Sequence, residues 1–464
     1  MRLSLSALIL VAAVVSSTEV PAAQLETSER NQARRLLLEA SRLIDEIPES
    51  QRSSAVANIA SQLSRSGDFE DALRISQSAK NQGGQDLATG LIAWQLVQRG
   101  NLGQALRLVE SISNDQNREA EYGSLAVLLA EKGDLTGALR IVQMRKEPQG
   151  RVSILVQIAQ QKARTKEKDF AEAGKLLKQA MQIGKELVDE NASNATVFSN
   201  IATTQSEIGD TAGALLTLAE LSAIAHQYGG PEGNALLLQL LGCAQAQVGD
   251  LVGALRTHEE MMPGSNSDIV LMAIAEEQAK QGLMTDALQT VERIRDVNLR
   301  SSTLRSVAIV RGKHGTLQDA VEAIDRIPDS PSRSEALGAL ALEQAVVDNP
   351  AAALTAQRAL EFASEVSSGS VSSNRGLEMT AVTRSVLGDF AGAQEIIRSM
   401  PEPESRVWPL WNLTSMLADA GRENEAVTLA ERENAPLPRL YALVGTAQGL
   451  LTHAASEEEA SAKK

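Results

Sequence analysis

The residues that could carry out chemistry in this chain are few and widely separated. Its four histidines are His226, His258, His314 and His453, and its single cysteine is Cys243. None of them has the spacing of a zinc site, and His258 lacks the second histidine of a zinc-protease helix. No phosphate-binding loop and no nucleophile elbow occur. The sequence therefore predicts a protein that is not an enzyme, with no catalytic residue, no metal site and no cofactor.

Arginine recurs near the expected start of the first helix of several repeated units, as Arg52, Arg118, Arg151, Arg300, Arg333, Arg406 and Arg439. One interpretation is structural, with each guanidinium bonding loop carbonyls or carboxylates of the preceding unit. The other is a stripe of positive charge that receives an acidic ligand, formed by Arg300, Arg333, Arg406 and Arg439. The sequence leaves both interpretations open.

A repeat of glycine and alanine sets the positions of these side chains. The glycines are Gly67, Gly100, Gly133, Gly209, Gly249, Gly282, Gly315, Gly388 and Gly421, and five of the intervals between neighbours are 33 residues. An alanine usually follows five residues later, at Ala72, Ala105, Ala138, Ala173, Ala214, Ala254, Ala287, Ala320, Ala353, Ala393 and Ala426. A fixed period of this length predicts an array of small supersecondary units.

Each unit has the pattern of a helical hairpin. In the first one, apolar residues at three- and four-residue steps predict a helix A that ends at Gly67, because glycine accepts the left-handed backbone of a helix end. Asp68 follows and is expected to cap helix B. Small residues at one position of each helix, such as Ala60 and Ala72, let the two helices approach closely. Prolines are expected between hairpins or, like Pro409, in a first helical turn.

This unit resembles the tetratricopeptide repeat over about residues 28–453. The matching positions in the first unit are Val56, Ile59, Ala60, Leu63, Gly67, Asp68, Phe69, Ala72, Leu73 and Ala79. The repeat length, the mostly aliphatic residues at large aromatic positions and the irregular closing proline depart from the family pattern. The resemblance implies an all-α solenoid of about eleven helical hairpins, wound as a right-handed superhelix whose helices A line a concave groove.

The resemblance also suggests where partners bind. It places Trp94, Trp408, Trp411 and Tyr441 on the groove face, where exposed aromatic side chains are typical binding anchors. The alternative is that Trp408, Trp411 and Tyr441 pack beneath the C-terminal end of the array. The basic residues with which some members of the family hold a peptide carboxylate are missing here.

The two ends of the chain differ from the repeats. Residues 1–23 combine Arg2, an apolar run from Leu3 to Val15 and small residues up to Ala23, which predicts a signal peptide cleaved near Ser17 or Ala23. Residues 24–49 and 437–453 are expected to be capping helices around an array at 50–436, and 454–464 a disordered tail. The sequence thus predicts a periplasmic or secreted protein with no membrane span after removal of the signal.

Composition limits the class of partner. The formal net charge is −15 and aromatic residues make up 2% of the chain. A surface of this charge disfavours nucleic acid and is compatible with basic partners. The sequence therefore favours a non-catalytic scaffold that binds a protein or peptide. A structural spacer that acts through the ends of the array is the alternative, and an enzyme with an unrecognised site is a third.

Overall fold

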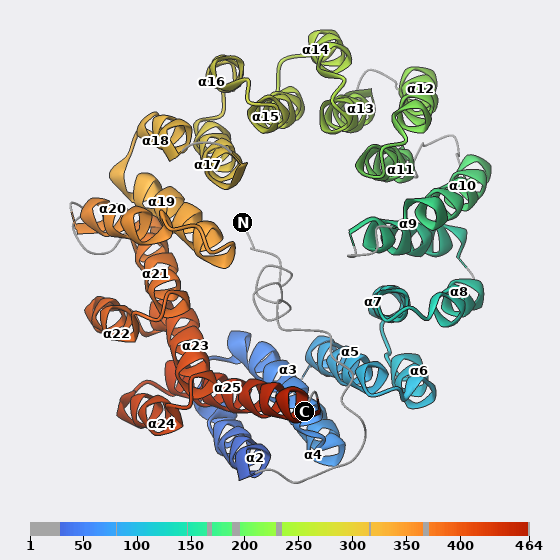
Figure 1. Cartoon of the computed structure of the whole chain (residues 1–464). Coiled ribbons are helices and arrows are strands. Elements are labelled where there is room, and N and C mark those ends of the chain that lie inside the picture. The colour runs from blue at the N-terminus through green and yellow to red at the C-terminus, as the bar shows by residue number, and fades with distance from the viewer. Residues whose placement is uncertain are drawn as a thin grey trace. The chain divides into compact units, whose positions relative to one another are not determined.

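The computed structural model describes residues 28–79, 81–145, 147–164, 169–187, 195–228, 234–314, 317–364 and 371–462. Within these ranges it contains twenty-four α-helices, one 3-10 helix and no β-strand (Figure 1). The prediction of an all-α chain is confirmed. The expected signal peptide at residues 1–23 lies outside the described residues.

Eleven successive pairs of helices form the array, and each pair has a helix A followed by a helix B. The pairs are α3 (Glu49–Ser66) and α4 (Phe69–Gln77), α5 (Gln82–Gln98) and α6 (Leu102–Glu110), α7 (Asp115–Glu131) and α8 (Leu135–Met144), α9 (Pro148–Arg164) and α10 (Phe170–Glu186), α11 (Ala195–Glu207) and α12 (Thr211–Tyr228), α13 (Asn234–Val248) and α14 (Leu251–Glu260), α15 (Ser265–Lys280) and α16 (Met284–Glu292), α17 (Val297–His314) and α18 (Leu317–Asp325), α19 (Ser330–Val346) and α20 (Ala352–Ser364), α21 (Val371–Val386) and α22 (Phe390–Ser399), α23 (Pro403–Asp419) and α24 (Glu423–Arg432). The predicted number of hairpins is confirmed for the part of the chain that the structure describes.

The array is flanked by α2 (Ser28–Arg42), a short 3-10 helix η1 (Ile44–Glu46) and the long helix α25 (Pro436–Ala462). The sequence predicts a disordered tail from residue 454, but α25 continues through residues 454–462. Tertiary contacts account for this correction. Ala454 is fully buried, and Glu458 pairs with Arg30 of α2 at 2.9 Å.

The hairpin turns follow the sequence pattern closely. Eight of the nine repeated glycines have φ between 72° and 106°, the left-handed region, and the ninth, Gly315, lies outside the described residues. The aspartate after the glycine usually caps helix B, as Asp250 does by accepting from Gly253 N at 2.9 Å. Asp68 is an exception that corrects the sequence prediction. Its carboxylate accepts from Ser66 and pairs with Arg34 of α2 at 3.2 Å instead.

The alanine positions lie in the contacts between helices. Ten of the eleven predicted helix-B alanines are completely buried, as Ala72 is. The exception is Ala353, which is exposed while Ala352 is completely buried. The reason is the turn before α20, where Asp348 replaces glycine at φ 54°. Four positions separate Asp348 from Ala352, whereas five separate Gly67 from Ala72, so the buried position comes one residue earlier.

The described chain divides into two compact units. The first contains residues up to 128 together with 388–464, and the second contains residues 129–387. In the first unit α25 packs against α2, α3 and α23; in the second, successive helices A from α11 to α21 pack against one another. No described helix is both long and apolar enough to cross a lipid bilayer.

Candidate binding surfaces

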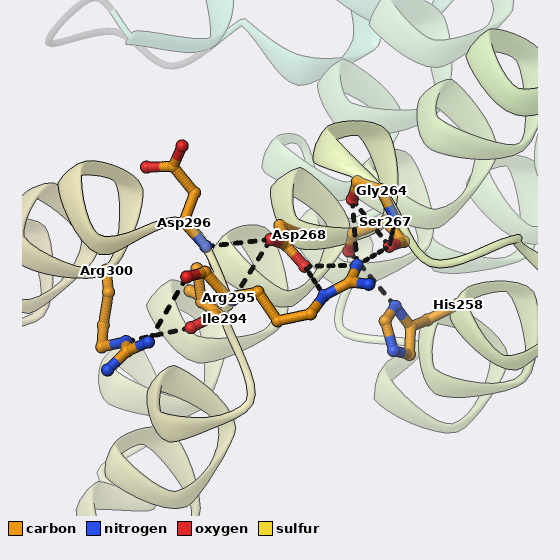
Figure 2. Close-up of polar contacts among 8 residues, drawn as sticks. All are labelled: His258, Gly264, Ser267, Asp268, Ile294, Arg295, Asp296 and Arg300. Carbon is orange, nitrogen blue, oxygen red and sulfur yellow. Dashed lines mark hydrogen bonds and ion pairs between the residues drawn. The ribbon is translucent and has the colours of Figure 1, made fainter.

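The arginines at the start of helix A hold the loop that precedes them. Arg300 donates from Nε to Ile294 O at 2.9 Å, and Arg333 donates from Nε to Ile327 O at 2.6 Å (Figure 2 shows Arg300). Arg333 also donates to Asp325 O at 3.1 Å. These contacts are the ones that the structural interpretation predicts, because the guanidinium donors satisfy loop carbonyls of the preceding unit.

The two C-terminal arginines of the predicted stripe pair with carboxylates. Arg406 pairs with Glu433 at 3.1 Å, and Arg439 pairs with Glu39 at 3.2 Å. All four arginines of the stripe therefore have acceptors within the protein. The contacts of Arg300 and Arg333 are with the preceding unit, as the structural interpretation predicts, whereas the partners of Arg406 and Arg439 lie after α24 and on α2. The binding of an acidic ligand to these arginines stays a prediction.

Two of the four predicted aromatic anchors are buried. Trp411 is 9% exposed and Tyr441 is 6% exposed, and their ring centroids lie 5.8 Å apart. Trp411 Nε1 donates to Gln448 Oε1 at 3.0 Å, while Asn58 of α3 donates to the Tyr441 hydroxyl at 3.5 Å. Burial raises the pKa of the Tyr441 phenol. The expectation that both rings lie exposed on one face is wrong; they pack where α3, α23 and α25 meet, as the alternative interpretation predicts.

The other two predicted anchors remain accessible to different extents. Trp94 on α5 is 37% exposed, whereas Trp408 on α23 is half-buried. Next to Trp408, Pro409 lies inside α23 rather than in its first turn, because the helix begins earlier, at Pro403. Of the four predicted anchors, Trp94 is the one with the exposed ring that a surface contact requires.

A close contact between helices A, which the sequence analysis did not single out, lies one helical turn from Trp94. The carboxyl group of Glu121 on α7 lies directly over Gly90 of α5, where a Cβ atom would be 2.3–2.6 Å from it. Burial raises the pKa of Glu121 to about 7. Gly90 is itself buried, so this small residue makes room for a neighbouring helix A rather than lining an open surface. The signal in the sequence was a glycine inside a helix, which needs a packing reason.

A buried aspartate organises the loop between two hairpins in the second unit. Asp268 on α15 is 3% exposed and accepts from Arg295 N at 3.2 Å and Asp296 N at 3.3 Å (Figure 2). The Arg295 guanidinium donates to the same carboxylate at 3.0 Å and to Ser267 Oγ at 3.0 Å. One carboxylate thus satisfies two loop amides and neutralises a nearby cation.

Asp86 likewise accepts hydrogen bonds from loop amides in the first compact unit. It is 2% exposed and accepts from Ser113 N and Asn114 N at 3.4 Å and from Asn117 Nδ2 at 3.2 Å. Burial alone would raise the pKa of Asp86, but a hydrogen bond from Gln82 at 2.9 Å, together with those named above, outweighs it and lowers that pKa. Asp86 and Asp268 both stand seven residues before the helix-A alanine, so their spacing was the signal that the sequence analysis missed.

A cleft of about 230 Å³ adjoins the Asp268 network. His258 of α14 lines it together with Arg293 and Arg295, and His258 Nδ1 lies 3.2 Å from Ser267 O (Figure 2 shows His258 and Arg295). Burial, and next the charge of Arg293, lower the pKa of His258. The cleft therefore combines a neutral imidazole with two guanidinium groups, of which Asp268 already neutralises one.

The Cys243 side chain is not placed as a nucleophile. Burial raises the pKa of the Cys243 thiol to about 11, which disfavours the nucleophilic thiolate. Within the described ranges, one set of side chains could hold a metal ion, namely Glu29, His453 and Glu457, whose ligand atoms lie within 4.8 Å of one another. His453 Nδ1 is already engaged by Asp419 O at 2.8 Å, and no further contact there points to a ligand.

No protein-family model and no curated protein matches the sequence. Several solved structures resemble this one. Ton1535 from Thermococcus onnurineus NA1 is 17% identical, covers 70% of this chain and 98% of its own, and has a TM-score of 0.33. A signal-transduction ATPase with a tetratricopeptide repeat sensor, PH0952 from Pyrococcus horikoshii, is 13% identical over 90% of this chain and 66% of its own, with a TM-score of 0.28. Yeast Tom70 is 11% identical over 94% of this chain and 97% of its own, with a TM-score of 0.26. Because identities and scores are low, the fold assignment rests on the helix order and packing described above.

Proposed function

We propose that this protein is a non-catalytic scaffold that binds another protein or a peptide through the face formed by its helices A. In the tetratricopeptide resemblance this face is the concave groove. A stack of helical hairpins presents side chains at regular intervals along a surface, and such arrays characteristically bind extended or helical segments.

The exposed ring of Trp94 carries this proposal. Trp94 is 37% exposed on helix A, and tryptophan is enriched among the residues that contribute most to binding at protein interfaces. By contrast, the buried carboxylates and the helix-A arginines already have partners within the protein. The surface near Trp94 is therefore a better candidate for a partner than these polar networks.

The charge of the chain indicates the chemistry of the partner. The formal net charge is −15, so the surface as a whole is acidic. A segment that carries an apolar or aromatic side chain beside basic residues complements this surface. Such a partner would bind faster at low salt, because charge steers the encounter.

The alternative function, a spacer that joins other proteins through its two ends, is less well supported. The first and last described helices, α2 and α25, pack against each other. The contact covers one face of each of these helices, so less of their surface is left for joining another protein.

We further propose that the protein acts outside the cytoplasm. The support is the sequence of residues 1–23, in which a basic residue, an apolar run and small residues follow in the order of a secretory signal. A single cysteine excludes an intrachain disulfide, so the mature array is expected to rely on packing alone.

The decisive experiment compares two exposed aromatic residues on opposite types of helix. Trp94→Ala removes the ring on helix A, and Phe170→Ala removes a ring of similar exposure, 40%, at the start of helix B α10. Affinity capture from the extracytoplasmic fraction, followed by a titration with the purified partner, is expected to show weaker binding for Trp94→Ala and unchanged binding for Phe170→Ala. Loss of binding in the Phe170→Ala protein alone would refute the helix-A proposal.

A further inference from the structure

Helix α2 has the buried pattern of a helix B. Its buried residues are Ala33, Leu36, Leu37 and Ala40. In α10, a helix B inside the array, the buried residues Ala173, Leu176, Leu177 and Ala180 have identical types and spacing. A helix B normally packs on the helix A that precedes it in the chain, but no described helix precedes α2.

Helix α25 has the features of a helix A. Ala447 is completely buried at the helix-A alanine position, and small residues fit α25 against α23. A Cβ atom on Gly445 would lie 2.3 Å from Trp411 O, and one on Gly449 would lie 2.1 Å from Ser415 O. A helix A normally carries its own helix B after it, but no described helix follows α25.

The two incomplete units complete each other in the packing. Within the array, α3 contacts its helix B, α4, and the next helix A, α5, while α4 also contacts α5. The same three contacts join α25 to α2, α25 to α3 and α2 to α3. In Figure 1 the red helix α25 accordingly lies beside the blue helices α2 and α3. The contact pattern of an ordinary hairpin is thus reproduced by helices from opposite ends of the chain.

Polar side chains also interact along this contact. Arg30 of α2 pairs with Glu458 at 2.9 Å, and both side chains are less than one-third exposed. Arg65 of α3 donates to Thr452 Oγ1 at 2.9 Å. Because these residues lie near the last turns of α25, they explain why that helix continues beyond the usual length of a helix A.

The position of the missing hairpin turn also fits. In the first hairpin the turn glycine stands seven residues after Ala60 and five before Ala72. The same offsets from Ala447 and Ala33 give residues 454 and 28. Next to these positions, His453 Nε2 lies 3.9 Å from the Glu29 carboxylate. The position in α25 at which a helix A would end therefore lies beside the start of α2, where a turn would join them, although no peptide connects them there and α25 continues to Ala462.

We propose that α25 and α2 form a twelfth hairpin, assembled without a connecting turn from the two ends of the chain. The surface of α25 is a docking site, and its occupant is residues 28–47 of the same molecule. This arrangement buries the apolar faces of both terminal helices, which repeat arrays otherwise cover with polar capping repeats. In this arrangement α2 stabilises α25, and α25 stabilises α2.

Cross-linking the full-length chain tests the proposal directly. Cysteines replace the paired residues in the variant Glu39→Cys/Arg439→Cys, in a Cys243→Ala background, and a short bismaleimide is added at low protein concentration. The expected product is an internally linked monomer, recognised by its altered mobility on a denaturing gel and by its intact mass. Lys185→Cys/Glu220→Cys joins an ion pair of 2.6 Å on neighbouring helices and is the positive control, and Glu39→Cys alone is the negative control.

Two outcomes would overturn the proposal. The first is no internal link in a sample whose control pair reacts. The second is linkage only between chains, which would assign the occupant of α25 to a second copy. Amide exchange of the unmodified chain provides an independent measurement. A helix as short as α2 is marginal alone, so its amides should exchange at least about 100-fold more slowly than unprotected ones only if α2 is docked. Exchange of α2 at the unprotected rate would contradict the twelfth hairpin.

Discussion

Arg439 donates from Nη2 to Oε1 of Glu39 at 3.2 Å, although 400 positions separate the two residues in the chain. Both side chains are partly exposed, at 36% and 43%. An ion pair of this kind stabilises a protein by less than about 1 kcal/mol. The contact between α2 and α25 is therefore stabilised mainly by apolar residues buried in the same helices, such as Leu37 and Leu440. The ion pair forms only when the two helices are packed together, so it can be used to detect their contact.

Reversing this charge pair should produce a small and recoverable effect. Arg439→Glu places two carboxylates together and is expected to lower the free energy of unfolding by about 0.5–1 kcal/mol. The double variant Arg439→Glu/Glu39→Arg should regain most of that loss. Urea titrations at low and high salt measure both effects, and the differences should shrink at high salt. Strictly additive single effects would argue against the contact.

Alanine variants of Trp94 and Trp411, which the sequence places on the same face, should differ in their stability to unfolding. Trp411→Ala removes a buried ring and is expected to cost about 3–5 kcal/mol, whereas Trp94→Ala should cost clearly less, because that residue is 37% exposed. Trp411→Phe is the milder control, since it keeps a ring beside Tyr441 and loses the hydrogen bond to Gln448. Thermal unfolding followed by circular dichroism gives the comparison. Equal losses for the two alanine variants would contradict the burial described above.

The stability of the first unit should depend on the protonation of Glu121. Its pKa is raised to about 7 in the folded protein, so the unfolded chain releases this proton at lower pH than the folded chain does. The resulting penalty is absent below the ordinary pKa of glutamate, grows as pH rises and is complete above about pH 7. Glu121→Gln removes it. As the pH rises from about 4.5 to about 7.5, the free energy of unfolding of the variant should therefore increase by about 1–3 kcal/mol relative to that of the wild type. This figure is reduced to allow for the partial exposure of Glu121.

Urea unfolding at a series of pH values measures this gain. Glu131→Gln is the matched control, because Glu131 is exposed on the same helix, α7, and should show no such trend. A constant difference between Glu121→Gln and wild type across the pH series would show that the Glu121 carboxyl titrates normally.

Removing the loop-holding carboxylate should cost more than removing a helix cap beside it. Asp268→Ala leaves the amides of Arg295 and Asp296 without their acceptor and is expected to cost about 2–3 kcal/mol. Asp296→Ala removes an ordinary cap that accepts from Leu299 N at 2.8 Å and should cost about 1 kcal/mol. Chemical denaturation ranks the two variants. The reverse order would mean that Asp268 does not hold the loop.

Export should leave a shortened N-terminus. Expression of residues 1–464 in a host with a secretion pathway should yield a mature chain that begins just after Ser17 or Ala23, as determined by intact mass. Leu8→Arg interrupts the apolar run and should leave the protein uncleaved and cytoplasmic. A wild-type protein that retains residue 1 in the cytoplasm would refute the proposed location.

The sequence by itself determined the local structure of this protein. A glycine such as Gly67 ends helix A because its backbone adopts φ 106°, and a buried Ala72 follows because two helices meet there. Both effects depend on residues close together in the chain, so their period revealed the eleven hairpins. Where the turn changed, at Asp348, the sequence pattern misplaced the buried alanine by one position.

Only the tertiary structure decided which surfaces are free. Periodicity shows that one face of a helix is buried, but not which neighbour buries it. Trp94 and Trp411 both fit the groove positions of the resemblance, yet the C-terminal contacts cover Trp411 alone. In the same way, the buried stripe of α2 was visible in the sequence, whereas its contact with α25 depends on a packing interaction between opposite ends of the chain. The residue pattern of one helix does not identify the helix that packs on it, because the hydrophobic effect is non-directional and any apolar partner can bury the same stripe.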